Sequence, residues 1–115
     1  MITGLPIGLA PGDGRRIWTF GHTLTLKATA TETGGRMTVV EVLAEPGGDS
    51  APHVHADEDE ALYVLEGEFE IVAGEDTARL GAGGFAFVPR GTPHGFTSVG
   101  EAAGRLLLVS TLGEP

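Results

Sequence analysis

Short stretches in which polar and apolar residues alternate run along the whole chain. Residues 23–29 alternate polar with apolar side chains, the period of two that is typical of a strand with one buried face. Strand patterns are also predicted over residues 37–43, 60–65, 68–71, 77–80, 85–88, 94–99 and 105–111. The 19 glycines and seven prolines punctuate the chain at short intervals, and no stretch has the period of a long amphipathic helix. The pattern therefore predicts an all-β domain, either a sandwich or a barrel.

Two of the predicted strands are apolar on both faces. After Glu60, residues 61–65 are all apolar, and so are residues 106–109. Strands of this kind are buried on both sides, so the outer face of the domain needs a cover. One candidate is the N-terminal arm that the Pro- and Gly-rich residues 1–16 are expected to form ahead of the barrel domain at 17–115. The other candidate is a second subunit.

Bulky aromatic side chains near residue 86 are expected to fill the core. Phe85 and Phe87 flank a single alanine, and the core of a β-barrel needs such side chains. We therefore predict that both pack in the interior.

The composition is that of one folded domain and argues against several functions. With 115 residues, the chain is long enough for a single modest core. Sixteen acidic against seven basic residues give a net charge of −9, which argues against binding nucleic acid or a membrane surface, because both need clustered Lys and Arg. The absence of cysteine excludes disulfides and thiolate ligands. No transmembrane helix or signal peptide is predicted, so a cytoplasmic protein is the expectation.

Three histidines and one glutamate form the most informative polar set in the sequence. His53 and His55 are two residues apart, so they point to the same side of an extended chain. Glu60 opens an apolar strand and would be buried, which calls for a partner. His94 opens another extended segment after the turn at 89–93. If these segments are neighbours in one sheet or barrel, three imidazole nitrogens and one carboxylate meet, a set that suits a divalent first-row metal ion.

The three acidic residues just before Glu60 and the fourth histidine of the chain have simpler interpretations. Asp57, Glu58 and Asp59 are expected to form a solvated turn. His22 lies in a different strand and is expected to be structural or to line a pocket, without binding the metal.

The spacing of glycines, prolines and ligands resembles the two conserved motifs of the cupin superfamily. The first motif is matched by Gly47, His53, His55, Glu60 and Gly67, and the second by Gly83, Pro89, Gly91 and His94. Four residues after His94 the family often has asparagine, and here the position is Ser98. Within the cupins, the two motif regions are most similar to the small quercetin-dioxygenase-like group. The resemblance spans about residues 17 to 111 and implies a double-stranded β-helix, or jelly-roll, cupin barrel. The resemblance also favours a homodimer, in which a second subunit covers the outer face.

A site with four protein ligands has room for a substrate. Four ligands on an octahedral ion leave about two positions open, and the charge of about +1 that remains favours an anionic or enolisable oxygen. The expected cofactor is a divalent transition metal: iron, manganese, nickel, cobalt, copper or zinc. The expected partner is a small organic molecule. Its pocket is predicted to include Leu62, Val64, Phe96, Ser98, Trp18 and Phe20.

Three kinds of activity are consistent with this site. The first is a dioxygenase for an enol or diol, with Glu60 as the catalytic residue that accepts the substrate's proton and the histidines holding the metal. The second is a redox-neutral cyclase, isomerase or lyase, in which the metal polarises a carbonyl; related small cupins include polyketide cyclases and isomerases. The third is a metal- or ligand-binding module without turnover.

Overall fold

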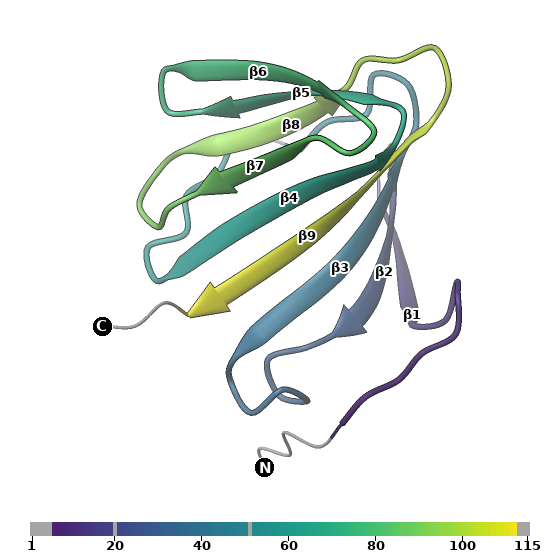
Figure 1. Cartoon of the computed structure of the whole chain (residues 1–115), viewed down its shortest axis with the longest axis vertical. Coiled ribbons are helices and arrows are strands. Elements are labelled where there is room, and N and C mark those ends of the chain that lie inside the picture. The colour runs from purple at the N-terminus through teal and green to yellow at the C-terminus, as the bar shows by residue number, and fades with distance from the viewer. Residues whose placement is uncertain (1–5, 20, 51, 113–115) are drawn as a thin grey trace.

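The fold is all-β, as the alternating pattern predicts. The computed structural model describes residues 6–19, 21–50 and 52–112, and this part of the chain contains nine strands (Figure 1). Their bounds are β1 Arg15–Thr19, β2 His22–Ala28, β3 Met37–Ala44, β4 Glu58–Glu66, β5 Glu68–Ala73, β6 Asp76–Gly81, β7 Phe85–Val88, β8 His94–Ser98 and β9 Gly104–Leu112. Within these ranges, no helix is long and apolar enough to span a membrane.

The strands form two antiparallel sheets that build a jelly-roll barrel. Six strands lie in the order β1-β2-β3-β9-β4-β7, and three lie in the order β6-β5-β8. Figure 1 shows the three-stranded sheet at the top and the larger sheet curving away below it. The last strand, β9, is inserted between β3 and β4, so neighbours in space are distant in sequence, as in a double-stranded β-helix rather than a meander.

Alternate side chains along the strands fill the space between the sheets. On β4, Glu60, Leu62 and Val64 are buried, whereas Tyr63 and Leu65 are exposed. The buried apolar side chains form one cluster with members from both sheets: Val42, Ala44, Leu62, Val64, Phe69, Ile71, Val88, Phe96 and Leu106. The predicted phase of β4, with Glu60 on the inner face, is confirmed.

The segment between β3 and β4 runs along the edge of β8 and extends the smaller sheet. The Gly47 N–H donates to the Ser98 carbonyl at 2.8 Å, and His53 and His94 exchange two backbone hydrogen bonds of 2.9 Å. Gly47 has a φ of +81°, a left-handed conformation that favours glycine. This glycine lets the chain turn from β3 onto the edge of β8, and the pairing that follows brings His53 beside His94.

The pairing of β7 with β4 turns two phenylalanines outward. Phe87 lies opposite Ala61, and Phe85 lies opposite Tyr63; these positions alternate with the inward-facing positions of β4. Phe85 is 59% exposed and Phe87 57% exposed, so the prediction that they pack in the core is wrong. The reason is register: the side-chain period is two, and therefore a shift of one residue exchanges the two faces of a strand.

The described N-terminal residues 6–14 form no strand, and they lie against the outer face of β2. The Lys27 ammonium of β2 donates a hydrogen bond of 2.6 Å to the Asp13 carbonyl. Strand β1 begins at Arg15, inside the range 1–16 that was predicted as an arm. The arm therefore covers only part of the outer face.

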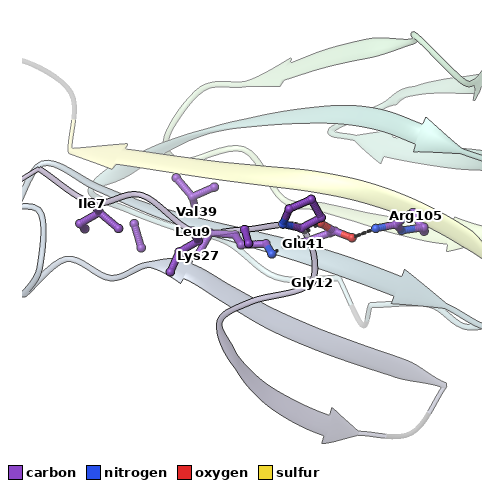
Figure 2. A pocket seen from close by; sticks show the side chains of 10 residues that line it. Ile7, Leu9, Gly12, Lys27, Val39, Glu41 and Arg105 are labelled. Atoms are coloured by element: carbon purple, nitrogen blue, oxygen red, sulfur yellow. Dashed lines mark hydrogen bonds and ion pairs between the residues drawn. The ribbon is translucent and has the colours of Figure 1, made fainter.

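A cavity of about 500 Å³ lies between this arm and the outer face (Figure 2). Ile7 and Leu9 line it together with Val39 of β3, and the ion pair of Glu41 with Arg105 lies beside it. It has the volume of a ligand pocket, but none of the predicted metal ligands lines it. The cavity is therefore separate from the predicted metal site.

Candidate metal centre

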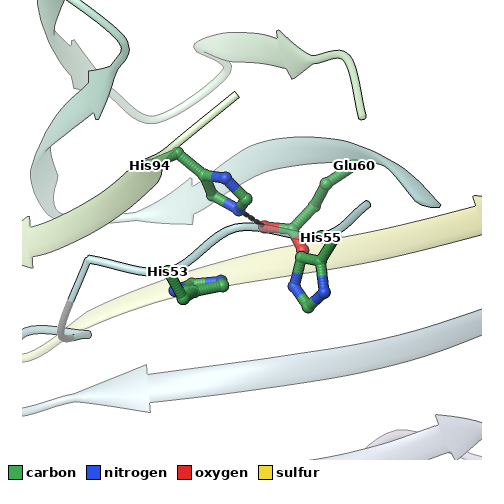
Figure 3. A group of neighbouring side chains, drawn as sticks. All are labelled: His53, His55, Glu60 and His94. Atoms are coloured by element: carbon green, nitrogen blue, oxygen red, sulfur yellow. Dashed lines mark hydrogen bonds and ion pairs between the residues drawn. The ribbon is translucent and has the colours of Figure 1, made fainter. Parts of the chain in front are cut away.

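The four side chains predicted to bind a metal converge inside the barrel. One donor atom from each of His53, His55, Glu60 and His94 lies within 4.8 Å of the other three donor atoms. Figure 3 shows the imidazole rings and the carboxylate turned toward one another. Glu60 belongs to β4 and His94 to β8, so the group bridges the two sheets.

Backbone pairing sets the position of His53. Because His53 and His94 form an isolated antiparallel bridge, their rings leave the backbone side by side, with centroids 4.3 Å apart. The ring of His55 follows, with its centroid 4.9 Å from that of His53. The close approach of the imidazoles therefore follows from the pairing of residues 47–50 and of His53 with β8.

The buried contact between His94 and Glu60 calls for a cation. Nε2 of His94 lies 3.0 Å from Oε1 of Glu60, and both side chains are buried. Nδ1 of His94 lies 2.9 Å from the Thr92 carbonyl oxygen; a carbonyl only accepts, so Nδ1 carries a proton. In a neutral ring, Nε2 would then face a carboxylate as a bare acceptor. The arrangement is favourable when a proton or a metal ion lies between the two atoms.

A second carboxylate orients His55. Its Nδ1 lies 3.5 Å from Oε1 of Glu58, and its Nε2 lies 3.6 Å from Oε2 of Glu60. A carboxylate at one ring nitrogen fixes the tautomer and makes the other nitrogen a better metal ligand. Glu58 and Asp59 belong to β4, so the expectation of a turn is wrong for these two residues.

A clamp between Asp59 and Arg90 fixes the loop that precedes His94. The Arg90 backbone N–H donates to Oδ1 of Asp59 at 3.0 Å, and the guanidinium Nε lies 3.4 Å from the same oxygen. These hydrogen bonds, the backbone one foremost, hold the pKa of Asp59 below its ordinary value. The N–H of Gly91 donates to the His55 carbonyl at 2.7 Å. The loop is therefore tied to β4 on one side and to a predicted metal ligand on the other.

The donor set fits a single divalent ion. Bonds of about 2.0–2.2 Å to nitrogen and oxygen put opposite donors about 4.2 Å apart, close to the 4.8 Å within which all four atoms lie. Small side-chain movements would bring the donor atoms to these bond lengths. Three imidazoles and one carboxylate match the preference of iron, manganese, cobalt, nickel, copper or zinc. The group can therefore hold a divalent metal and leave positions open for other ligands.

A cavity of about 470 Å³ adjoins this group. Besides His53, its lining comes from β1, β2, β8, β9 and the edge segment: Thr19, His22, Leu24, Asp49, Ser50, Phe96 and Leu108. The volume is in the range of small-molecule sites. His22 thus lines a pocket, which is one of the two roles expected for it. Leu24 and Leu108 were not predicted, although each follows from the phase of its strand.

The structure brings only some of the predicted pocket residues to this cavity. Phe96 lines it. Leu62 and Val64 are 1% and 0% exposed and lie in the core cluster instead. Ser98 is buried as well, and its hydroxyl has no hydrogen-bond partner in the described part of the chain.

The register of β1 places Trp18 away from the cavity. Trp18 lies opposite Thr23, between the positions of His22 and Leu24, whose side chains line the cavity. Its side chain therefore points to the outer face, and it is 73% exposed. Phe20, also predicted for the pocket, lies outside the described residues.

The fold and the site together define a class of protein, a small antiparallel β-barrel with a group of side chains on its inner wall that could hold a metal ion. A family profile described as the cupin domain matches residues 40–110. The chain belongs to this family, as the motif spacing predicts.

Proteins with different named activities are similar to the chain. Quercetin 2,3-dioxygenase of Bacillus subtilis (strain 168) is 35% identical over 94 residues, which are 80% of this chain and 27% of that protein. The chain thus spans about a quarter of the relative's length. The crystal structure of TT1209 from Thermus thermophilus is 30% identical with a TM-score of 0.74, covering 81% of this chain and 85% of that one. The polyketide cyclase RemF from Streptomyces resistomycificus is 27% identical with a TM-score of 0.75, covering 96% and 82%.

Proposed function

We propose that this chain is a metal-dependent dioxygenase that acts on a small organic molecule bearing an enol or a diol. The observation that supports it most is the group of four side chains that could hold a metal ion, one of which, His53, lines a cavity of about 470 Å³. A metal bound there would supply Lewis acidity and, if redox-active, electron transfer to dioxygen. The similarity to quercetin 2,3-dioxygenase favours oxygen chemistry.

Glu60 is the residue to which we assign proton transfer. Its Oε1 faces His94 at 3.0 Å, and its Oε2 accepts a hydrogen bond of 3.4 Å from the Ser110 hydroxyl. The longer contact makes Oε2 the more available atom for the proton of a substrate enol or diol. Glu60 is 5% exposed, so a proton that it accepts is shielded from bulk water.

The test of the oxygenase is turnover with controlled metal and oxygen. Metal-free protein is loaded separately with iron(II), manganese(II), cobalt(II), nickel(II) and zinc, and each form is offered flavonols and catechols. We expect turnover only with dioxygen and a redox-active metal, with label from ¹⁸O₂ in the product. Turnover that persists without oxygen, or with zinc as the sole active metal, contradicts the oxygenase.

A redox-neutral cyclase, isomerase or lyase is the second candidate. The similarity to the polyketide cyclase RemF, which extends over 96% of this chain, favours it. In that reaction Glu60 would move a proton within the substrate while the metal polarises a carbonyl. Anaerobic turnover of the zinc form supports this candidate. Binding of metal and ligand without turnover under either atmosphere leaves the non-catalytic module.

We also propose that the chain forms a homodimer through its outer face. Tyr63, Phe85 and Phe87 are 44%, 59% and 57% exposed and neighbour one another on β4 and β7. Exposed apolar groups of this kind mark interaction sites. Sedimentation at micromolar concentration should give twice the chain mass, and Phe85→Ser should weaken the association without loss of metal. A monomer mass for the unmodified chain contradicts the dimer.

A further inference from the structure

The segment between β3 and β4 carries one residue more than β8 in the stretch that leads to His53. Asp49 pairs with Thr97, and His53 pairs with His94. Between these two pairs the segment advances four positions, from 49 to 53, whereas β8 advances three, from 97 to 94. An extra residue on one side of an antiparallel pair is a β-bulge, a feature that re-aims the side chains that follow it.

This bulge decides which side chains of the segment face the barrel interior. In a regular ladder continued from Asp49, Pro52 would lie opposite His94, and His53 would take the outer face, because a shift of one residue exchanges the two faces. The observed exposure follows the bulged register: Pro52 and Val54 are exposed, whereas His53 and His55 are partly buried. The extra residue therefore brings both histidines to the inner face.

The side chain of Ser50 completes the pairing at the point where the bulge begins. The Ser50 N–H donates to the Phe96 carbonyl at 2.9 Å, as in a regular ladder. In such a ladder the Phe96 N–H would donate in return to the Ser50 carbonyl. Here this N–H donates to the Ser50 hydroxyl at 3.0 Å. The hydroxyl thus takes the place of a backbone carbonyl, and a backbone donor at a buried residue keeps its partner.

Two neighbours of Ser50 fit the same bulge. A Cβ at Gly95 would lie 3.1 Å from the Ser50 carbonyl oxygen and 3.6 Å from Cα of Pro52, so glycine gives the segment room to pass close to β8. Pro52 has no N–H, and therefore it leaves no donor unpaired where the two chains are out of step. Serine, proline and glycine at these positions all favour the bulged register.

We propose that Ser50 is a positioning residue of the metal centre, whose hydroxyl fixes the bulge and thereby holds the ring of His53 beside that of His94. Without the hydroxyl, either the Phe96 N–H loses its acceptor or the Ser50 carbonyl returns to the ladder. The first loosens the segment and the second moves it toward the register in which His53 faces outward. The proposal rests on the proposed function, since it takes His53 to be one of the metal ligands.

A double-mutant cycle on metal affinity tests this role. Ser50→Ala should weaken cobalt(II) binding about tenfold in chelator competition, the lower value for loss of a residue that orients a ligand. In a His53→Ala background the same change should have no further effect, because the side chain that Ser50 positions is gone. Ser50→Thr keeps the hydroxyl and should bind cobalt(II) as the unmodified protein does.

Ser98→Ala is the matched control for the loss of a serine hydroxyl. Ser98 is buried on the inner face of β8, and its hydroxyl has no hydrogen-bond partner among the residues that the structure describes. Because no hydrogen bond of this kind is lost, the Ser98→Ala protein should bind cobalt(II) with unchanged affinity.

A measurement on the metal-free protein detects the positioning directly. The ring centroids of His53 and His94 lie 4.3 Å apart, close enough for nuclear Overhauser contacts between their ring protons. These contacts should weaken in Ser50→Ala and persist in Ser50→Thr and Ser98→Ala.

The outcomes distinguish this proposal from the proposed function. Ring contacts that persist in Ser50→Ala, equal weakening of cobalt(II) binding with and without His53, or an equal loss in Ser50→Thr overturns the role of Ser50, while the metal centre stands. If the unmodified protein binds no cobalt(II), the metal centre and this proposal fail together. If the cycle and the ring contacts behave as expected but no substrate is turned over under either atmosphere, the positioning role holds and the enzymatic function fails.

Discussion

Replacing Glu60 with glutamine tests whether the buried carboxylate is a metal ligand. The change keeps the size of the side chain and its ability to form hydrogen bonds, but it removes the only negative charge among the four predicted donors. Loss of a residue that only orients a ligand weakens metal binding by up to about 100-fold. Loss of a ligand itself should therefore weaken metal binding by at least about 100-fold.

The expected effect can be expressed as a change in melting temperature. Metal at 100 times its dissociation constant stabilises the native protein by about 2.7 kcal/mol. For 115 residues, the unfolding entropy is about 0.24 kcal/mol/K, so the melting temperature of the unmodified protein should rise by about 11 °C. At the same metal concentration, a 100-fold weaker Glu60→Gln protein gains only about 0.4 kcal/mol, or less than about 2 °C.

The assay is thermal unfolding of metal-free protein with and without cobalt(II). Glu66→Gln is the matched control, because Glu66 belongs to the same strand, but its side chain is 63% exposed and lies outside the metal-binding group. This control should show the full rise. An undiminished rise in Glu60→Gln, or a rise lost equally in both variants, would refute the assignment of Glu60 as a ligand.

Three further substitutions test features that support the site. Leu62→Ala should lower the free energy of unfolding by about 2–5 kcal/mol in urea titrations while one metal per chain is retained; loss of metal with little destabilisation would contradict the placement of Leu62 in the core. Asp59→Asn breaks the ionic clamp on Arg90 and should weaken metal binding about tenfold in chelator competition; an unchanged affinity means that the clamp does not position the loop. Gly104→Ala would place a Cβ 2.7 Å from Phe69, and such overpacking should cost about 1–3 kcal/mol in the same titrations; full stability would show that the core can shift.

The ligand set could be predicted from the sequence because spacing and residue type both restrict it. Glu60 opens a strand whose alternate residues are buried, and His94 opens another. For His53 and His55, the prediction from the alternation of side chains along a strand was less accurate. His53 forms only an isolated bridge, and His55 lies in no strand. They converge because the segment that carries them pairs with β8, a contact that local periodicity does not contain.

Features that depend on register or on long-range contacts could not be predicted. The outward positions of Phe85 and Trp18 follow from which residues face them on β4 and β2. The clamp of Asp59 with Arg90 joins residues 31 positions apart. In each case the sequence supplies the side chain, but the neighbouring strand decides which way it points.

The predicted metal ligands and the neighbouring cavity share β8 and the segment along it, but part of the cavity wall comes from other strands. The donors come from β4, β8 and the segment that runs along β8, whereas His22, Leu24 and Leu108 of the cavity come from β2 and β9. Substitutions on β2 or β9 can therefore change which molecule fits while the four donors stay in place. Conversely, the identity of the metal can change the reaction without reshaping the cavity. This separation gives a physical reason why proteins similar to one chain include both a dioxygenase and a polyketide cyclase. It also means that substrate class and reaction type have to be measured by separate experiments on this protein.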